Sequence, residues 1–221
     1  MEYRSMKIKL TAVAMVICLV ALAASGKGFA LRTGDLLFKE YPADSAFTDA
    51  VVAATQSLDR YRFSHVGVAV ERNGAIEVIE AVFSGVKVTP LDSFLLTARH
   101  IGEQPVVMAA RLKEQYRKAI PEAVKRMEQL IGKPYDREFL PGNDAYYCSE
   151  LIESTFLIDG KPIFETKPMT FKDKATGETS PLWVSYFEEL RRPIPEGVPG
   201  TNPGTMSRSE CLHPLGLVPQ K

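Results

Sequence analysis

The sequence predicts a single α+β domain, in which an antiparallel sheet packs against helices. Three observations lead to this fold class. Two apolar runs between Ser64 and Val82 flank Asn73-Gly74, a dipeptide that strongly favours a two-residue hairpin turn. Segments with apolar residues at helical spacing stand on both sides of this hairpin. The 221 residues contain neither an internal repeat nor a second apolar run pattern that would build another core.

The composition is that of an ordinary globular domain. Hydrophobic residues make up 45% of the chain and charged residues 24%, which excludes a disordered chain and a small disulfide-rich scaffold. Basic and acidic side chains both number 27, so the chain lacks the basic excess with which proteins bind nucleic acid. We therefore expect no nucleic-acid partner.

Residues 1–26 have the pattern of a secretory signal peptide. Basic residues precede an apolar run, Leu10–Ala24, which is interrupted only by Thr11 and is followed by small residues. The run is shorter than the roughly 20 residues of a membrane-spanning helix. We expect cleavage, export to the periplasm or the exterior of a bacterial cell, and no stable membrane span afterwards. An uncleaved N-terminal anchor is the alternative, whereas Ile17 is too large to precede a lipidated Cys18.

The elements around the hairpin follow from apolar runs and turn signals. A turn signal introduces the apolar run 34–38, which we predict as the first strand. Residues 45–57 place apolar side chains at helical spacing behind Ser45, a candidate N-cap. After the hairpin, the sequence favours a strand over 85–89 and a short helix over 90–97.

The second half of the chain is predicted to be mostly helical. A strand over 106–112 precedes an amphipathic helix over 121–131, which has Pro121 in its first turn. Residues 145–157 form a largely buried helix in this interpretation, and 180–190 form the last helix.

The chain is therefore divided into a signal peptide over 1–26, a globular domain over 27–192 and a C-terminal tail over 193–221. Pro and Gly dominate the sequence from Arg191 onward. We expect this tail to lie along the surface or to be mobile.

The hairpin register places His65 and Glu80 on one face of the sheet. With Asn73 and Gly74 at the centre of the turn, Gly67 lies opposite Glu80, and His65 has the same parity as Gly67. Diagonal neighbours of this kind are about 7 to 8 Å apart. A carboxylate there can bind one imidazole nitrogen and leave the other available as a base.

Cys148 lies in the first turn of the predicted helix 145–157. The small residues Gly67 and Ala69 share the face of His65, so we expect this helix to cover that face and bring Cys148 to His65. The positive end of the helix and a neighbouring imidazolium are expected to lower the thiol pKa below about 8.5. Backbone N–H groups of the first turn can stabilise an oxyanion. This set of groups is suited to acyl transfer through a thioester.

Each of these residues also has a structural interpretation. A lone Cys148 in an apolar helix can simply pack, and a lone His65 in a strand can be a hydrogen-bonded core or surface residue. Glu80 can be a charge that protects an edge strand. The three residues together favour a catalytic site more strongly than each does alone, because the hairpin register and the helix phase were assigned from other residues.

The remaining cysteine and histidines indicate neither a disulfide framework nor a metal site. Cys211 could pair with Cys148, but it lies in the Pro/Gly-rich tail. The spacing of the cysteines to His65, His100 and His213 matches no zinc-ligand pattern, so we expect no metal and no cofactor. His100 and His213 are predicted surface residues.

Five sequence blocks resemble a known family. LRTGDLLF, YRFSHVGVAVERNG, VIEAV, GKPYD and YYCSELIE, in this order, are similar to the YiiX/YebB-like branch of the NlpC-type cysteine peptidase superfamily. The resemblance runs from Leu31 to about Ser209. It implies a circularly permuted papain-like fold, in which the histidine precedes the cysteine in the sequence.

The resemblance also implies the residues of the site. The family's triad of cysteine, histidine and a third polar residue falls on Cys148, His65 and Glu80. Tyr147 resembles a position that lines the site in relatives, and Tyr146 is a second candidate for substrate binding. Phe83, Phe139 and Leu140 can also border the site.

Three functions remain open at this point. The first is a secreted thiol hydrolase that cleaves amide bonds of cell-wall peptides, as many members of the superfamily do. A lipid acyl hydrolase or acyltransferase could use the same triad, and a domain that binds an envelope ligand without turnover is the third possibility. A peptide site needs placed polar and charged groups, whereas an acyl site needs an apolar groove.

Overall fold

A six-stranded antiparallel sheet forms the centre of the protein. The computed structural model describes residues 29–42 and 46–219, so the expected signal peptide over 1–26 lies outside the described residues. The strand order is β12-β7-β1-β2-β3-β4, and all neighbouring strands are antiparallel. The strands are β1 (Leu36–Lys39), β2 (His65–Arg72), β3 (Ala75–Val82), β4 (Gly85–Pro90), β7 (Val107–Leu112) and β12 (Leu212–Leu217).

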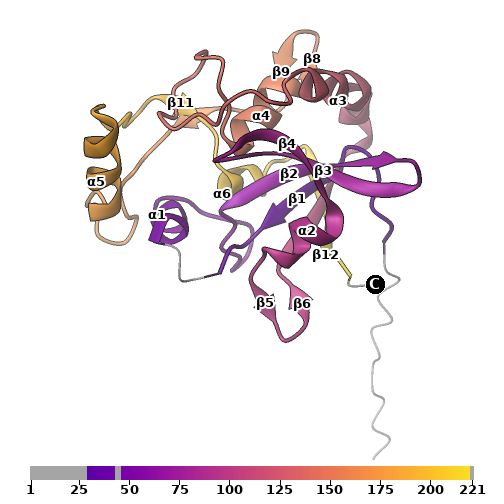
Figure 1. The fold of residues 1–221 in the computed structure, drawn as a ribbon, viewed down its shortest axis with the longest axis horizontal. Helices are drawn as coiled ribbons and strands as arrows, with labels where there is room; N and C mark the ends of the chain where they lie inside the picture. Colours follow the sequence, from indigo (N-terminus) through magenta and orange to yellow (C-terminus); the bar gives the residue numbers. More distant parts are fainter. Residues whose placement is uncertain (1–28, 43–45, 220–221) are drawn as a thin grey trace, which may run out of the picture.

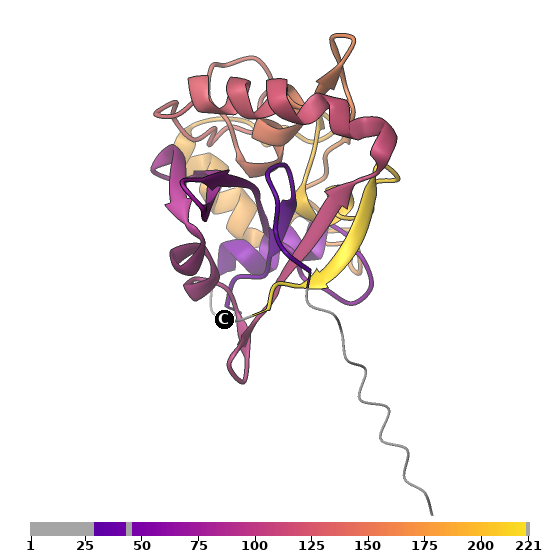
Figure 2. The same ribbon diagram turned by 90° about the vertical axis from the view of Figure 1, so that its right-hand side faces the viewer.

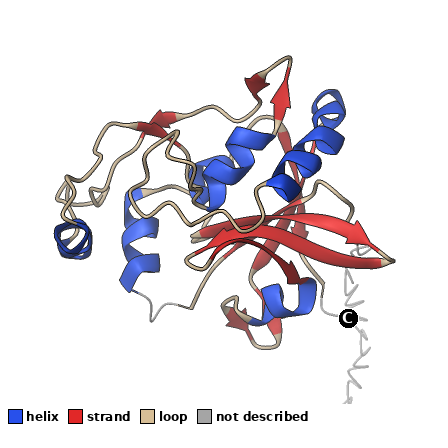
Figure 3. Ribbon diagram, turned by 45° about the horizontal axis from the view of Figure 1, so that its top comes forward, coloured by secondary structure: helices blue, strands red, loops and turns tan. Residues whose placement is uncertain are grey.

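Helices lie on both faces of this sheet and beside it, which confirms the α+β class (Figure 1, Figure 3). They are α1 (Ala46–Ala54), α2 (Leu91–Leu96), the 3₁₀ helix η1 (Glu114–Ala119), α3 (Ile120–Gln129), α4 (Cys148–Thr155), α5 (Pro181–Leu190) and α6 (Pro203–Met206). Three short ribbons complete the fold: β5 (His100–Ile101) with β6 (Gln104–Pro105), β8 (Leu157–Ile158) with β9 (Lys161–Pro162), and β10 (Lys167–Pro168) with β11 (Pro199–Gly200). In the described part of the chain, none of the helices has the length and hydrophobicity that crossing a bilayer requires.

The hairpin between β2 and β3 has the predicted register. Asn73 and Gly74 both have positive φ, at 51° and 77°, as a type I′ turn requires. Arg72 pairs with Ala75, and the pairing continues to the opposition of Val68 and Ile79. This register places Gly67 against Glu80, and a Cβ added to Gly67 would lie 3.3 Å from Glu80 Cβ.

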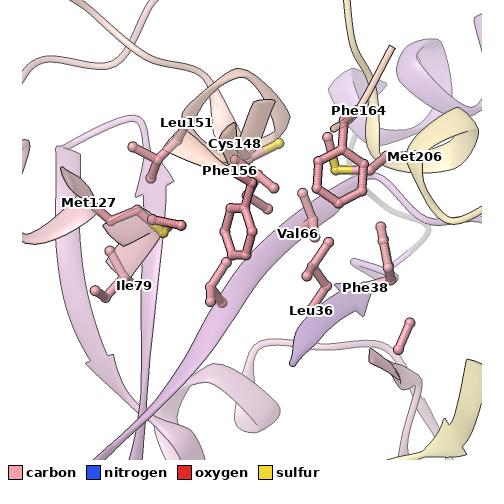
Figure 4. Packing of buried hydrophobic residues seen from close by; sticks show 14 of the residues in the cluster. Leu36, Phe38, Val66, Ile79, Met127, Cys148, Leu151, Phe156, Phe164 and Met206 are labelled. Atoms are coloured by element: carbon pink, nitrogen blue, oxygen red, sulfur yellow. The ribbon is translucent and has the colours of Figure 1, made fainter. Parts of the chain in front are cut away.

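The two faces of the sheet have different covers. Helices α3 and α4 pack on the face that carries Val66, Val68 and Ile79, with side chains such as Leu151 and Met127 (Figure 4). The prediction that the cysteine helix covers the face of Gly67 and Ala69 is therefore wrong. The branched side chains offer the larger apolar surface, and that surface takes the two longer helices.

The short helix α2 covers the opposite face. Its Phe94 is fully buried and packs in a second core cluster with Leu37, Ala69 and Val78. The small side chain of Ala69 leaves room for this aromatic ring. His65 and Glu80 point to this side of the sheet, because they share parity with Gly67 and its partner.

A third, aromatic cluster joins α1 and α5 to the body of the protein. Phe139, Tyr147, Phe171, Trp183 and Phe187 are all buried in it. Trp183 contacts Phe171 edge to face, with ring centroids 5.0 Å apart. The cluster places a wall of rings beside the first turn of α4.

The C-terminal segment is part of the domain, and the expectation of a separate surface or mobile tail over 193–221 is wrong for the residues described. Strand β12 pairs with β7 and forms one edge of the main sheet (Figure 2). Pro214 and Gly216 lie at an irregularity in this pairing, where the register shifts. An edge strand tolerates both residues, which explains why a Pro/Gly-rich sequence still forms a strand.

Gly85 is a position where the fold requires glycine. Its φ is +107°, and an added Cβ would lie 2.6 Å from the carbonyl oxygen of Lys133, which accepts a hydrogen bond from Val86 N. We expect Gly85→Ala to lower the free energy of unfolding by about 2 to 3 kcal/mol. Urea unfolding measures this loss.

Gly74→Ala is the matched control. Gly74 also has positive φ, but no atom lies within 4 Å of its added Cβ. The free energy of unfolding of this control should fall by only about 1 kcal/mol. Equal losses in both variants would contradict the role assigned to the contact with Lys133.

Candidate active site

His65 and Glu80 form a buried hydrogen-bonded pair. His65 is the first residue of β2, and its Nε2 lies 2.6 Å from Glu80 Oε2. The other carboxylate oxygen accepts a hydrogen bond of 2.6 Å from Thr89 Oγ1 on β4. His65 and Glu80 are 4% and 3% exposed. The predicted interaction between these two side chains is therefore present.

The environment sets the protonation of this pair. Burial acts to raise the pKa of Glu80, but the hydrogen bond and charge of His65, with smaller contributions from Lys39 and Thr89, lower it to about 2. Burial lowers the pKa of His65, and the bond to Glu80 only partly opposes this. At neutral pH the pair is thus a carboxylate and a neutral imidazole. Because a carboxylate only accepts, Nε2 carries the proton and Nδ1 keeps a free lone pair.

Cys148 is the first residue of α4, and its sulfur lies in space beside the start of β2. Tyr147 is the N-cap, and its backbone N–H donates to Glu150 Oε2 at 3.3 Å. The sulfur of Cys148 accepts hydrogen bonds from the backbone of Val66 and from the first turn of its own helix. Val66 directly follows His65, so the sulfur and the imidazole belong to the same end of the strand. Figure 4 shows Cys148 above the sheet on the side of Val66.

The surroundings of Cys148 favour the protonated thiol. Burial raises the pKa of Cys148 to about 12, and hydrogen bonds from Val66, Ser149 and Cys148 N–H groups do not outweigh it. The expectation of a thiol pKa lowered by the helix and by an imidazolium is therefore wrong for this state. The imidazole of His65 is neutral, and a thiol that is 6% exposed loses the hydration that a thiolate needs.

Lys39 and Tyr41, which were not predicted as site residues, also lie beside this pair. Lys39 is opposite His65 in the register of β1 and β2, and it is 1% exposed. The ring of Tyr41 lies 5.5 Å from that of His65. The alternation of residues along a strand shows which side chains share a face of that strand. It does not show which other strand lies beside β2, so these two residues could not be predicted from it.

A cavity of about 680 Å³ opens at Cys148. Its wall includes the predicted Tyr147. The other aromatic rings that line it are Phe47, Tyr116, Tyr135, Phe139, Phe164, Phe171 and Trp183. The charged side chains at the cavity are all exposed, and they are Glu165, Lys167, Lys174, Arg208 and Glu210. The buried part of the wall is therefore uncharged.

Residues with unpartnered polar side-chain atoms line this cavity. Among the described residues, four buried side-chain atoms lack a hydrogen-bond partner: Ser64 Oγ, Ser149 Oγ, Trp183 Nε1 and Thr201 Oγ1. All four residues line the cavity. Buried polar groups in proteins are normally hydrogen-bonded. All four belong to the wall of one cavity, which makes their residues candidates for contact with a bound molecule.

Several other predicted residues lie elsewhere. Tyr146 is half-buried against the main core cluster and is not on the cavity wall, and Leu140 does not line it either. Phe83 is 54% exposed and packs on Phe47 and Tyr135 outside the wall.

Both described cysteines are free thiols, and Cys211 lies on the same cavity wall as Cys148. His100 and His213 are exposed, as predicted. Over residues 29–42 and 46–219, no group of three or more His, Cys, Asp or Glu side chains could hold a metal ion.

Comparison with known proteins finds a relative of similar sequence and a solved structure of similar fold. YiiX of Escherichia coli strain K12 is 32% identical over 143 residues, which are 62% of this chain and 63% of the relative, so the match spans less than two thirds of that protein. A crystal structure described as that of the metalloprotein YiiX from Escherichia coli O157:H7 superposes with a TM-score of 0.68. It covers 86% of this chain and 98% of the other at 23% identity, which establishes the shared fold.

Residues 30–215 match the family model described as permuted papain-like amidase enzyme, YaeF/YiiX, C92 family. The match includes both strands of the hairpin, the helix of Cys148 and most of the C-terminal segment. The expected order of histidine before cysteine is that of the permuted fold. The chain therefore belongs to the YaeF/YiiX family of permuted papain-like amidases.

Proposed function

We propose that this protein is a cysteine hydrolase that cleaves amide bonds through a thioester on Cys148. The buried hydrogen bond of His65 to Glu80, at the strand end where the Cys148 sulfur meets Val66 N–H, is the observation that carries the proposal. Family membership supports the same reaction class. A ligand-binding domain without turnover would need neither the thiol nor the oriented base.

The raised thiol pKa favours general-base attack over a preformed ion pair. In this mechanism His65 Nδ1 accepts the thiol proton while the sulfur attacks the substrate carbonyl. Glu80 stabilises the imidazolium that forms. The backbone N–H of Cys148 is available to the tetrahedral oxyanion. The imidazolium then protonates the leaving amine, and His65 activates a water molecule that hydrolyses the thioester.

Amide bonds of cell-wall peptides are the first substrate class that we propose, with export to the bacterial envelope. The exposed charges of both signs around the cavity can hold the carboxylates and amines of such peptides. The aromatic, uncharged wall inside supports a second candidate, an apolar acyl group of a lipid. Both classes share the acyl-enzyme on Cys148, and they differ in what fills the cavity.

The structure of YiiX from E. coli O157:H7 is described as that of a metalloprotein, whereas the reaction proposed for this chain uses no metal. His65 Nε2 and both oxygens of Glu80 are already hydrogen-bonded to each other and to Thr89. No described cluster of donors offers a replacement site. The proposed reaction therefore uses only the protein's own side chains.

Substitutions of Cys148 and Glu80 test the mechanism. We expect Cys148→Ala to abolish turnover and the acyl adduct without unfolding, because it removes one sulfur atom from a packed helix. Glu80→Gln should lower kcat by about 100-fold or more, because a neutral amide orients and stabilises the imidazolium poorly. Turnover of muropeptides and of phospholipids, with the mass of the Cys148 adduct, measures both effects.

Glu77→Gln on the same strand is the matched control, since Glu77 pairs with Arg72 and not with His65. It should keep the activity of the parent. Turnover by Cys148→Ala protein would rule out the covalent mechanism.

The unpartnered groups of the cavity give a separate prediction. Thr201→Val and Trp183→Phe keep most of the shape but remove one hydroxyl and one indole N–H. We expect each to raise KM by about tenfold for the substrate that uses the lost group, with kcat nearly unchanged. The melting temperature of Trp183→Phe should not fall, because the indole N–H has no partner in the free protein. An unchanged KM on both peptide and lipid substrates would show that these groups do not bind them.

A further inference from the structure

A buried ammonium group lies beside the His65–Glu80 pair. Lys39 Nζ donates to Thr97 Oγ1 at 3.0 Å and lies 3.5 Å from the carbonyl oxygen of Phe94. It also lies 3.8 Å from the centroid of the Phe94 ring and 4.6 Å from that of Tyr41. The end of this lysine is thus enclosed by α2 and by the residues that follow β1.

This placement is unfavourable for the stability of the fold. Within the described residues, no carboxylate lies within 4.0 Å of Lys39 Nζ, and its direct partners are neutral. A buried charge without a close counterion is costly. Burial lowers the pKa of Lys39 to about 8, against the attraction of Glu80. A buried lysine that destabilises the fold and lies beside the candidate site is expected to have a functional role.

The charged and titratable groups around Lys39 come from every neighbouring strand. His65 lies directly opposite on β2, and Glu80 is the next ionisable group of that face on β3. Lys87 on β4 pairs with Glu80 in the register but is exposed. Tyr41 and the Cys148 thiol complete the set. Lys39 is thus the buried cation that faces the pair.

We propose that Lys39 is a positioning residue that keeps His65 unprotonated and Glu80 ionised, and thereby extends the activity of the base to lower pH. The inference rests on the proposed role of His65 as the base. It acts through charge, because the hydrogen bonds of the ammonium group go to Thr97 Oγ1 and to the carbonyl oxygen of Phe94. Arg would preserve this effect, and an isosteric apolar residue would remove it.

The sign of the effect follows from the charges. A positive charge near His65 makes the imidazolium less favourable, so it lowers the pKa of His65, as burial does. The same charge favours the carboxylate of Glu80. Because the pKa of Lys39 is about 8, the ammonium stays charged throughout the acidic range in which His65 titrates. Removing it should raise the pKa of His65 and move the acidic limb of kcat/KM to higher pH.

The experiment is an NMR titration of the His65 ring in the full-length protein. The chain has three histidines, and the His65 signal is assigned by its loss in His65→Gln. We expect Lys39→Met to raise the pKa of His65 by about one unit, and Lys39→Arg to leave it near the parent value. Lys87→Met is the matched control, and its shift should be smaller because water screens the exposed lysine. The acidic limb of kcat/KM should move with the pKa in each variant.

Further measurements distinguish this electrostatic role from a structural one. The melting temperature of Lys39→Met at pH 7 should equal or exceed that of the parent, because the variant no longer buries a charge. A pKa of His65 unchanged in Lys39→Met, or a lower melting temperature without a pKa shift, would overturn the inference. Lys39→Gln provides the same titration if the Met variant does not fold. Because the titration needs no turnover, a shift without any amidase activity would refute the proposed function and leave the electrostatic effect established.

Discussion

The hydrogen bond between His65 and Glu80 depends on the register of one hairpin. Asn73-Gly74 sets the turn, the turn sets which residues face each other, and the absent side chain of Gly67 leaves room for the diagonal contact. A shift of one residue would turn both side chains to the opposite face of the sheet. The rest of the site is arranged around this pair, with Thr89 behind the carboxylate.

The sheet separates the two halves of the candidate machinery. The imidazole and the carboxylate belong to the face covered by α2, whereas α4 packs on the Val-rich face. The Cys148 sulfur lies at the backbone of Val66, the second residue of β2, so the start of α4 lies at the end of the strand that carries His65. The position of the helix start is therefore as important as its packing.

Burial controls the chemistry of the site in two ways. It keeps the thiol and the imidazole neutral, which places the proton on the sulfur until a substrate arrives. It also leaves hydroxyl and indole groups without partners along an aromatic wall. Both features stabilise the free protein poorly, and both are suited to a bound acyl group that supplies contacts and accepts the nucleophile.

The sequence by itself determined the elements and the His65–Glu80 pair. Alternating apolar residues and the Asn-Gly turn act locally, so the strands, the helix of Cys148 and the hairpin register could be read without knowing the fold. The tertiary structure alone decided which face α4 covers, the pKa of Cys148, the inclusion of the Pro/Gly-rich segment in the sheet, and the place of Lys39 beside His65. These depend on strand order and on burial, which arise from contacts between segments far apart in the chain and leave no periodic pattern in the sequence.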